Sequence, residues 1–410
     1  MPPRFGDIDP PQRLLMGPGP VNAHPRVLRA MSADLLGQFD PEFTAYMNEV
    51  MALYRPVFCT ENKWTFLIDG TARAGIESAL VSLTTPGDRV LVINYGRFGL
   101  LLREILGRIG AEVVTVDAPW GEVVPLEAIK EAIEQHEPKV VATVFGDTST
   151  TMAQPVQGIG ELCREAGAYF YIDATATLSG MPFYTDEWQV DIVTCGLQKC
   201  LGGPAGCAPI TVSDRAAEFI FNRRHTEEGI RNPELQQGNG PRIPSNYFDL
   251  AMIMDYWSER RLNHHTEATS MLYCARECAR VAMEEGLHAR WKRHSLAGQA
   301  MVAGVRAMGF KVYGDDAHRM SNVTGIWIPD EVDGERVRDR MRTEFEIEIG
   351  TAFGPLKGQI WRIGAMGFNA AQHKVLITLG ALEAVLRAEG MAVPAGEGVD
   401  AAWGVYAHAA

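Results

Sequence analysis

Long apolar segments are absent from this chain of 410 residues. No run reaches the roughly 18 consecutive apolar residues that would suggest a membrane-spanning helix. The first residues, Met1-Pro-Pro-Arg-Phe5, contain no apolar core of the kind that a secretion signal needs. We therefore expect a cytoplasmic protein with no membrane partner.

Basic charge is also scarce. The chain has 38 lysine and arginine residues against 51 aspartate and glutamate residues, which gives a net charge of −13. The basic residues are interspersed rather than clustered, so the sequence predicts no patch that would attract nucleic acid phosphates or anionic lipids. We therefore expect no nucleic acid partner.

Cysteine and histidine form few patterns. The seven cysteines are an odd number and include no paired Cys-x-x-Cys motif, which fits reduced thiols. The ten histidines show no spacing typical of metal ligands except the adjacent His264 and His265, and neighbours in sequence cannot easily face one ion. The sequence therefore predicts no metal site.

From Trp64 onward, short apolar segments alternate with amphipathic ones that have a helical period. Predicted strands cover 65–68, 89–93, 112–116, 140–144, 169–172 and 192–194, and predicted helices cover 72–83, 98–109, 126–135 and 158–165. Continuous apolar strands between helices predict an α/β fold, in which a mostly parallel sheet is covered by helices. Ligands bind such sheets at the carboxyl ends of the strands.

The pattern changes beyond Tyr256. Two long helical segments meet at Gly286, and they precede strands predicted at 310–313, 323–328 and 360–363 and a helix at 372–388. This order predicts a small C-terminal α+β domain. We expect four parts: an N-terminal arm at 1–16, a large domain at 17–286, a small domain at 287–390 and a mobile tail at 391–410. Glycines in and beside the polar segment 231–246 would also suit a lid.

Lys199 follows a strand of apolar residues and precedes the turn Gly202-Gly203-Pro204. Asp173 ends another apolar strand 26 residues earlier. A lysine and an acid at strand ends are what pyridoxal phosphate requires, because the amine bonds to its aldehyde and the acid keeps its ring nitrogen protonated. The alternatives are a surface lysine and an aspartate that caps a helix.

The segment Gly70-Thr71-Ala72-Arg73 lies at a predicted junction between a strand and a helix. Free backbone N–H groups and the helix dipole favour a phosphate at such a place. The Thr71 hydroxyl and the Gln198 amide could add donors, whereas the role of the Arg73 side chain stays open. Glycine turns before helices are common, so this motif is weakly specific when taken alone.

Six short motifs occur in order along the chain. They are Gly17-Pro-Gly-Pro-Val-Asn22, Asp69-Gly-Thr-Ala-Arg73, Tyr171-Ile-Asp173, Gly196-Leu-Gln-Lys199, Asn263-His-His-Thr266 and Trp361-Arg-Ile-Gly364. Over roughly residues 15–388 they resemble the alanine/serine–glyoxylate aminotransferase group (class V) of fold-type I pyridoxal-phosphate enzymes. The resemblance implies an aminotransferase that uses pyridoxal phosphate, takes an amino donor and glyoxylate, and forms a homodimer with shared active sites.

The same resemblance implies roles for individual residues. Lys199 and Asp173 are the catalytic pair, and Lys199 also moves a proton. Phe98 stacks on the pyridine ring, Thr148 bonds near its 3′-oxygen, and Thr175 lies below the ring. Phe98 could instead be an apolar helix residue, and both threonines could be turn residues.

Arg362, in the predicted strand 360–363, is assigned to the substrate carboxylate. A guanidinium is costly to bury without an anion and binds a carboxylate with two hydrogen bonds. Arg362 could otherwise face outward at a strand edge. By resemblance, Gly19 lies beside the substrate, and Thr266 reaches the phosphate in the neighbouring subunit's site; in sequence alone, Thr266 could also cap a helix.

Two amides, Gln38 and Asn263, resemble those of group members that act on (S)-ureidoglycine. An amide both donates and accepts hydrogen bonds, as the urea of that substrate does. The implied reaction transfers its amino group to glyoxylate and yields oxalurate and glycine, a step in purine catabolism. The rival hypotheses are alanine– or serine–glyoxylate transamination, cysteine desulfuration, and a binding protein without catalysis.

Overall fold

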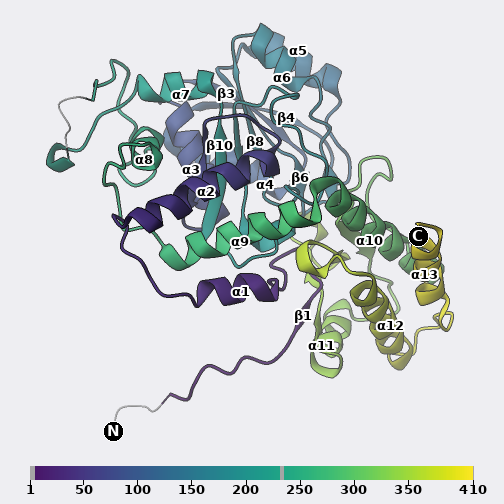
Figure 1. The fold of residues 1–410 in the computed structure, drawn as a ribbon. Helices are drawn as coiled ribbons and strands as arrows, with labels where there is room; N and C mark the ends of the chain where they lie inside the picture. Colours follow the sequence, from purple (N-terminus) through teal and green to yellow (C-terminus); the bar gives the residue numbers. More distant parts are fainter. Residues whose placement is uncertain (1–4, 231–234, 410) are drawn as a thin grey trace.

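The computed structural model describes residues 5–230 and 235–409 (Figure 1). Within that part of the chain, the main sheet has seven strands in the order β2-β10-β9-β8-β5-β3-β4. Their bounds are β2 Trp64–Asp69, β3 Arg89–Asn94, β4 Glu112–Asp117, β5 Val140–Val144, β8 Tyr169–Asp173, β9 Ile192–Thr194 and β10 Cys207–Val212. The α/β fold with a mostly parallel sheet is confirmed, since β10 is the only one of these seven described strands that runs opposite to the others.

Strand β10 is the exception that the sequence pattern missed. The chain leaves β9, makes the single helical turn η1 (Leu197–Leu201) and returns as β10 between β2 and β9. Parallel neighbours need a long crossover, usually a helix, whereas a short return reverses the chain direction. This reversal places Lys199 in the connection itself, at the edge where the parallel strands end.

Helices cover this sheet and close its core (Figure 1). The helices of this part are α1 Pro25–Met31, α2 Pro41–Phe58, α3 Ala72–Leu83, α4 Arg97–Ile109, α5 Leu126–His136, α6 Ile159–Glu165, α7 Asp214–Phe221, α8 Leu250–Trp257 and α9 Thr269–Glu285. Helices α2 and α9 pack against each other, so segments far apart in sequence lie side by side. None of the helices in the described ranges combines the length and the apolar character that crossing a bilayer requires.

A second core follows in the C-terminal part. It is formed by a sheet in the order β11-β14-β13 and by the helices α10 to α13. The bounds are α10 Leu287–Ala307, β11 Val323–Trp327, α11 Gly334–Glu344, β13 Gly350–Thr351, β14 Ile360–Gly364, α12 Gln372–Ala388 and α13 Glu397–Ala409. The strand predicted at 310–313 is wrong, because only Val312 bridges to this sheet, at Ile326.

The two cores meet near Gly286. Helix α9 contributes to the large core and α10 to the second one. Because α9 and α10 belong to different cores, we continue to propose a domain boundary at Gly286. Near the N-terminus, β1 (Leu14–Leu15) pairs with β12 (Ile347–Glu348) of the small domain.

The mobile tail predicted at 391–410 is wrong for its described part. Helix α13 packs along α10 and buries Gly398 and Ala402. A glycine in α10, Gly304, permits this close approach, because an added Cβ there would lie 2.8 Å from the Gly398 carbonyl oxygen. The segment 231–246, which was considered as a lid, lies partly outside the described residues.

Candidate active site

A cavity of about 310 Å³ opens at the carboxyl ends of the parallel strands. It brings together predicted residues from six separate segments of the chain. They are Gly19, Thr71, Ala72, Arg73, Phe98, Thr148, Asp173, Thr175, Gln198 and Lys199. Gly70 directly precedes Thr71 but does not itself line the cavity.

Lys199 lies in the turn η1, where its own backbone leaves the helical conformation (φ −117°, ψ −126°). Its Nζ donates to the carbonyl oxygen of Pro18. Burial, followed by the positive charge of Arg362, lowers the pKa of the Lys199 amine to about 8. A lowered pKa makes the neutral, nucleophilic form of the amine accessible near neutral pH.

Asp173 ends β8 and is only 3% exposed. Thr175 donates to Oδ1 of Asp173 from its backbone N (2.9 Å) and from its hydroxyl (2.5 Å). Among the described residues nothing donates to Oδ2, so that oxygen is free to receive a donor from a ligand in the cavity. Burial raises the pKa of Asp173 to about 6, and a cationic ligand group beside it would favour the charged form.

Helix α3 begins at Ala72, and its first turn points at the cavity. Thr71 occupies the cap position but makes no side-chain capping bond, so the first N–H groups of the helix and the Thr71 hydroxyl stay available. Gly70 has φ +120°, and an added Cβ would lie 2.7 Å from Cβ of Ala74. The Gln198 amide also lines the cavity, where its NH₂ group could donate to an anion. This arrangement suits a phosphate.

Phe98 is fixed by a capping arrangement that the sequence reasoning missed. Its backbone N donates to Oδ2 of Asp147 (2.8 Å), and Ser149 donates from its own backbone N to Oδ1 of the same carboxylate (2.8 Å). The Ser149 hydroxyl accepts from the backbone N of Arg97 (2.9 Å). The available signal was Asp147 and Ser149 at the end of a strand, since both residue types cap helices; here they cap α4, which is remote in sequence.

Arg362 lies in β14 and lines a second hollow that adjoins the cavity at Lys199 and Thr148. It is 3% exposed, and its Nε donates to the carbonyl oxygen of Thr351 at 2.8 Å. A further nitrogen donates to the carbonyl oxygen of Thr148 in the large domain. Burial lowers the pKa of Arg362 to about 10. The alternative of an outward-facing arginine is therefore wrong.

Arg362 shares this second hollow, of about 280 Å³, with Lys199. Three residues that the sequence reasoning did not select also line it: Arg97, Arg338 and Phe353. The Phe353 ring centre lies 4.9 Å from the guanidinium carbons of both Arg97 and Arg362. These arginines make the hollow suitable for an anionic substrate. No local motif marks them, because they come from separate elements.

Four predicted residues do not line either hollow: Gly70, which adjoins Thr71, and the more remote Gln38, Asn263 and Thr266. Nε2 of Gln38 donates to Oδ1 of Asn263 at 2.8 Å, so the two selected amides do lie together. Asn263 and Thr266 are exposed. Within one chain, this cluster therefore lies apart from Lys199.

The described geometry defines a class of protein, and comparison with known sequences identifies it. The family model of class V aminotransferases matches residues 28–356. A crystal structure of ureidoglycine–glyoxylate aminotransferase from Bacillus subtilis superposes with a TM-score of 0.91 at 47% identity, covering 98% of this chain and 100% of that chain. The chain belongs to the class V aminotransferase family, and it is a transaminase with the fold-type I architecture.

Sequence identity to individual relatives shows which members of the family this chain resembles more. The (S)-ureidoglycine–glyoxylate transaminase of Bacillus subtilis (strain 168) is 49% identical over 402 residues, which cover 97% of this chain and 96% of the relative. The alanine–glyoxylate aminotransferase of Drosophila melanogaster is 34% identical over 388 residues, which cover 93% and 94% of the two chains. Alanine–glyoxylate enzymes are thus the more distant of these relatives.

Proposed function

We propose that this transaminase transfers the amino group of (S)-ureidoglycine to glyoxylate and releases oxalurate and glycine. The reaction would serve purine catabolism. Support comes from the higher identity to the ureidoglycine enzyme than to the alanine enzyme, 49% against 34%. The observation that carries the proposal is the pair of amides, Gln38 and Asn263, joined at 2.8 Å.

Pyridoxal phosphate is the cofactor that the cavity fits. The free first turn of α3 offers N–H donors to its phosphate, Asp173 Oδ2 offers an acceptor to its ring nitrogen, and the Lys199 amine can bond to its aldehyde. When bound, this cofactor withdraws electrons from the substrate carbon and carries the amino group between the two half-reactions. Phe98 would stack on its ring, and Thr148 and Thr175 lie in the wall around it.

Residues of the chain itself would transfer the proton and bind the substrate carboxylate. Lys199 accepts and returns the proton of the substrate carbon, a task for which a pKa of about 8 is well suited. Arg362 binds the carboxylate that ureidoglycine and glyoxylate share, by exchanging backbone carbonyl partners for a carboxylate. The second hollow, lined by Arg97 and Arg338, supplies further positive charge for this anion.

The two amides would select the ureido group. The Gln38 amide donates one N–H to Asn263, and its own oxygen is buried without a partner among the described residues. A urea can donate to such an oxygen and accept from an amide N–H. A methyl side chain could satisfy neither group, and each unpaired buried group costs about 1–3 kcal/mol; a hydroxymethyl side chain offers a single atom where a urea offers three.

We further propose a cytoplasmic homodimer in which these amides and Thr266 reach the partner's cavity. Their position outside their own cavity, with Asn263 and Thr266 exposed, supports contact with a second copy. All seven cysteines are unpaired, which supports a reducing compartment.

Donor specificity tests the proposal directly. We expect kcat/KM with glyoxylate as acceptor to be highest for ureidoglycine, generated in place, and lower for alanine and serine. Gln38→Ser and Asn263→Tyr should each lower the ureidoglycine value about 5- to 150-fold, as the loss of 1–3 kcal/mol predicts, without lowering the alanine value. Gln299→Ser, at an exposed amide on α10, is the matched control. A wild-type preference for alanine or serine, or full ureidoglycine turnover in both variants, would refute the assignment.

A further inference from the structure

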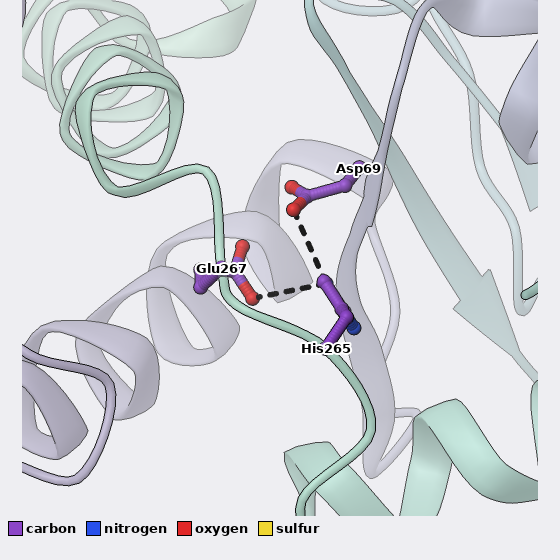
Figure 2. Close-up of side chains that lie close together, drawn as sticks. All are labelled: Asp69, His265 and Glu267. Atoms are coloured by element: carbon purple, nitrogen blue, oxygen red, sulfur yellow. Dashed lines mark hydrogen bonds and ion pairs between the residues drawn. The ribbon is translucent and has the colours of Figure 1, made fainter.

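Three potential metal ligands meet outside the candidate active site. Asp69 ends β2, and His265 and Glu267 lie in the segment that leads into α9 (Figure 2). One ligand atom from each side chain lies within 4.8 Å of the other two. His265 Nε2 is 3.1 Å from Oδ2 of Asp69 and 3.8 Å from Oε2 of Glu267. The side chains of Asp69 and Glu267 are 9% and 2% exposed.

The hydrogen bonds of His264 and His265 indicate which nitrogen of His265 faces the two carboxylates. Nε2 of His264 faces the carbonyl oxygen of Asn246 at 3.1 Å and must donate to it. A neutral imidazole has one donor and one acceptor nitrogen, so the other nitrogen of His264, Nδ1, accepts. Nδ1 of His265 lies 2.8 Å from that nitrogen and must therefore donate. The remaining nitrogen of His265, Nε2, faces two carboxylate oxygens.

The carboxylates also lack partners. Neither Oε2 of Glu267 nor Oδ1 of Asp69 has a hydrogen-bond partner among the described residues, and the Tyr256 hydroxyl beside them has none either. Arg261 offers partial compensation, but its terminal nitrogens donate to Trp257 and Asn48. A ring nitrogen and two carboxylates with unpartnered oxygens converge on one point, where a cation would offset the buried negative charge.

We propose that Asp69, His265 and Glu267 bind one divalent transition-metal ion, of the kind represented by Zn²⁺ and Mn²⁺. One imidazole nitrogen and two carboxylate oxygens form a suitable ligand set for such ions. The supporting shell is present as well: His265 donates its other N–H to His264, and Asp69 Oδ2 accepts from the backbone N of Ala268 at 2.9 Å. Metal-binding histidines and carboxylates characteristically have such outer partners.

The proposed ion has a structural role. It joins the end of β2, directly before the phosphate-binding turn at Gly70, to the segment that carries Asn263 and Thr266. Sequence spacing missed the site because Asp69 lies 196 residues from His265. His264, the neighbour considered as a ligand, instead acts as a hydrogen-bond partner.

Metal binding to the tag-free, cofactor-loaded enzyme tests the proposal. After dialysis against a chelator, titration with ZnCl₂ or MnCl₂ alone should show one ion bound per chain and a raised thermal midpoint. Glu267→Gln and His265→Gln should each weaken binding at least tenfold, and His264→Asn about 10- to 100-fold. His318→Gln is the matched control, because His318 pairs with Asp315 on the surface without a third ligand. Its binding should equal that of the wild type.

X-ray absorption at the zinc edge provides a readout that does not depend on the variants folding. We expect one imidazole nitrogen and carboxylate oxygens around the ion. A shell that contains sulfur, or binding that survives in folded Glu267→Gln and His265→Gln, would place the ion elsewhere and overturn the assignment. Failure to bind either metal stoichiometrically would also overturn it.

Discussion

Gln38 Nε2 donates to Oδ1 of Asn263 across 2.8 Å, although 225 residues separate them in sequence. The contact joins the segment before α2 to the segment before α9 and places both amides away from the cavity that holds Lys199. If these amides select the substrate, they must do so in a cavity other than the one in their own chain. Substrate selectivity would then depend on how two chains assemble into a dimer.

Mixed dimers should therefore restore activity. We expect Lys199→Ala and Asn263→Tyr homodimers to be poor with ureidoglycine, but their co-expressed heterodimer to contain one site with Lys199 from one chain and Asn263 from the other. Random pairing predicts recovery to about a quarter of wild-type activity, since half of the dimers are mixed and each has one complete site. Steady-state assays of the purified mixture give the measurement.

A Lys199→Ala, Asn263→Tyr double variant mixed with wild type serves as the control for simple dilution. If the mixture of single variants shows no more activity than its parents, although mass spectrometry shows heterodimers, the amides act within their own chain.

Gly19 lies against the Lys199 side chain. An added Cβ would lie 2.4 Å from both Cδ and Nζ of Lys199, and Gly19 has φ +102°, a conformation that strains other residues by about 1–3 kcal/mol. Gly19→Ala should therefore displace the lysine and strongly reduce covalent capture of pyridoxal phosphate, measured by borohydride reduction and mass spectrometry. Gly17→Ala should capture normally, because its nearest neighbour would lie at an ordinary 3.5 Å. Equal capture by both variants would contradict this interpretation.

The Lys199 amine should lose its proton at an unusually low pH. Burial and the charge of Arg362 lower its pKa to about 8 from an ordinary 10.5, so the neutral fraction should rise as pH increases through 8. Competitive acylation of the cofactor-free enzyme, followed by mass spectrometry of the Lys199 peptide, measures that midpoint. In Arg362→Gln the midpoint should move upward. A midpoint that matches a lysine model peptide, about 10.4, would show that the cavity does not desolvate the amine.

Asp147 should prove necessary for positioning Phe98. Its two oxygens accept from Phe98 and from Ser149, so Asp147→Asn leaves an NH₂ group facing an N–H donor. We expect a loss of about 1–3 kcal/mol in unfolding free energy and weaker cofactor retention, measured by denaturant titration and dialysis. Asp333→Asn is the control, since Asp333 caps α11 through a single oxygen and asparagine caps equally well. Similar losses in both variants would argue against a special role for Asp147.

Much of the large domain was predictable because its signals are local. Helix α3 begins and ends where the apolar period predicted, and the strands β5 and β9 match their predicted bounds. The direction of β10 was not predictable, because direction depends on how the chain returns rather than on the pattern of the strand itself. Helix α13 was missed because alanine and glycine give it little amphipathic pattern, and its burial depends on α10.

Some residues of the cavity could likewise be predicted from local sequence signals, and others could not. Lys199, Asp173 and Thr71 were recognisable because each follows a strand, and strand ends converge at one edge of a parallel sheet. Phe353 and Arg338 carry no such mark, since they reach the hollow from the small domain. Asp147 was recognisable as a capping residue type, but the helix that it caps begins 50 residues earlier, at Arg97.

The sequence by itself determined which segments become strands or helices and which reactive side chains stand at strand ends, because side-chain periodicity and turn chemistry act over a few residues. Only the tertiary structure decided which distant groups meet. Arg362 with the Thr148 carbonyl, Gln38 with Asn263, and Asp69 with His265 are separated by 214, 225 and 196 residues. The number of residues between two groups does not fix the distance between them in space. That distance is set by how the two cores pack.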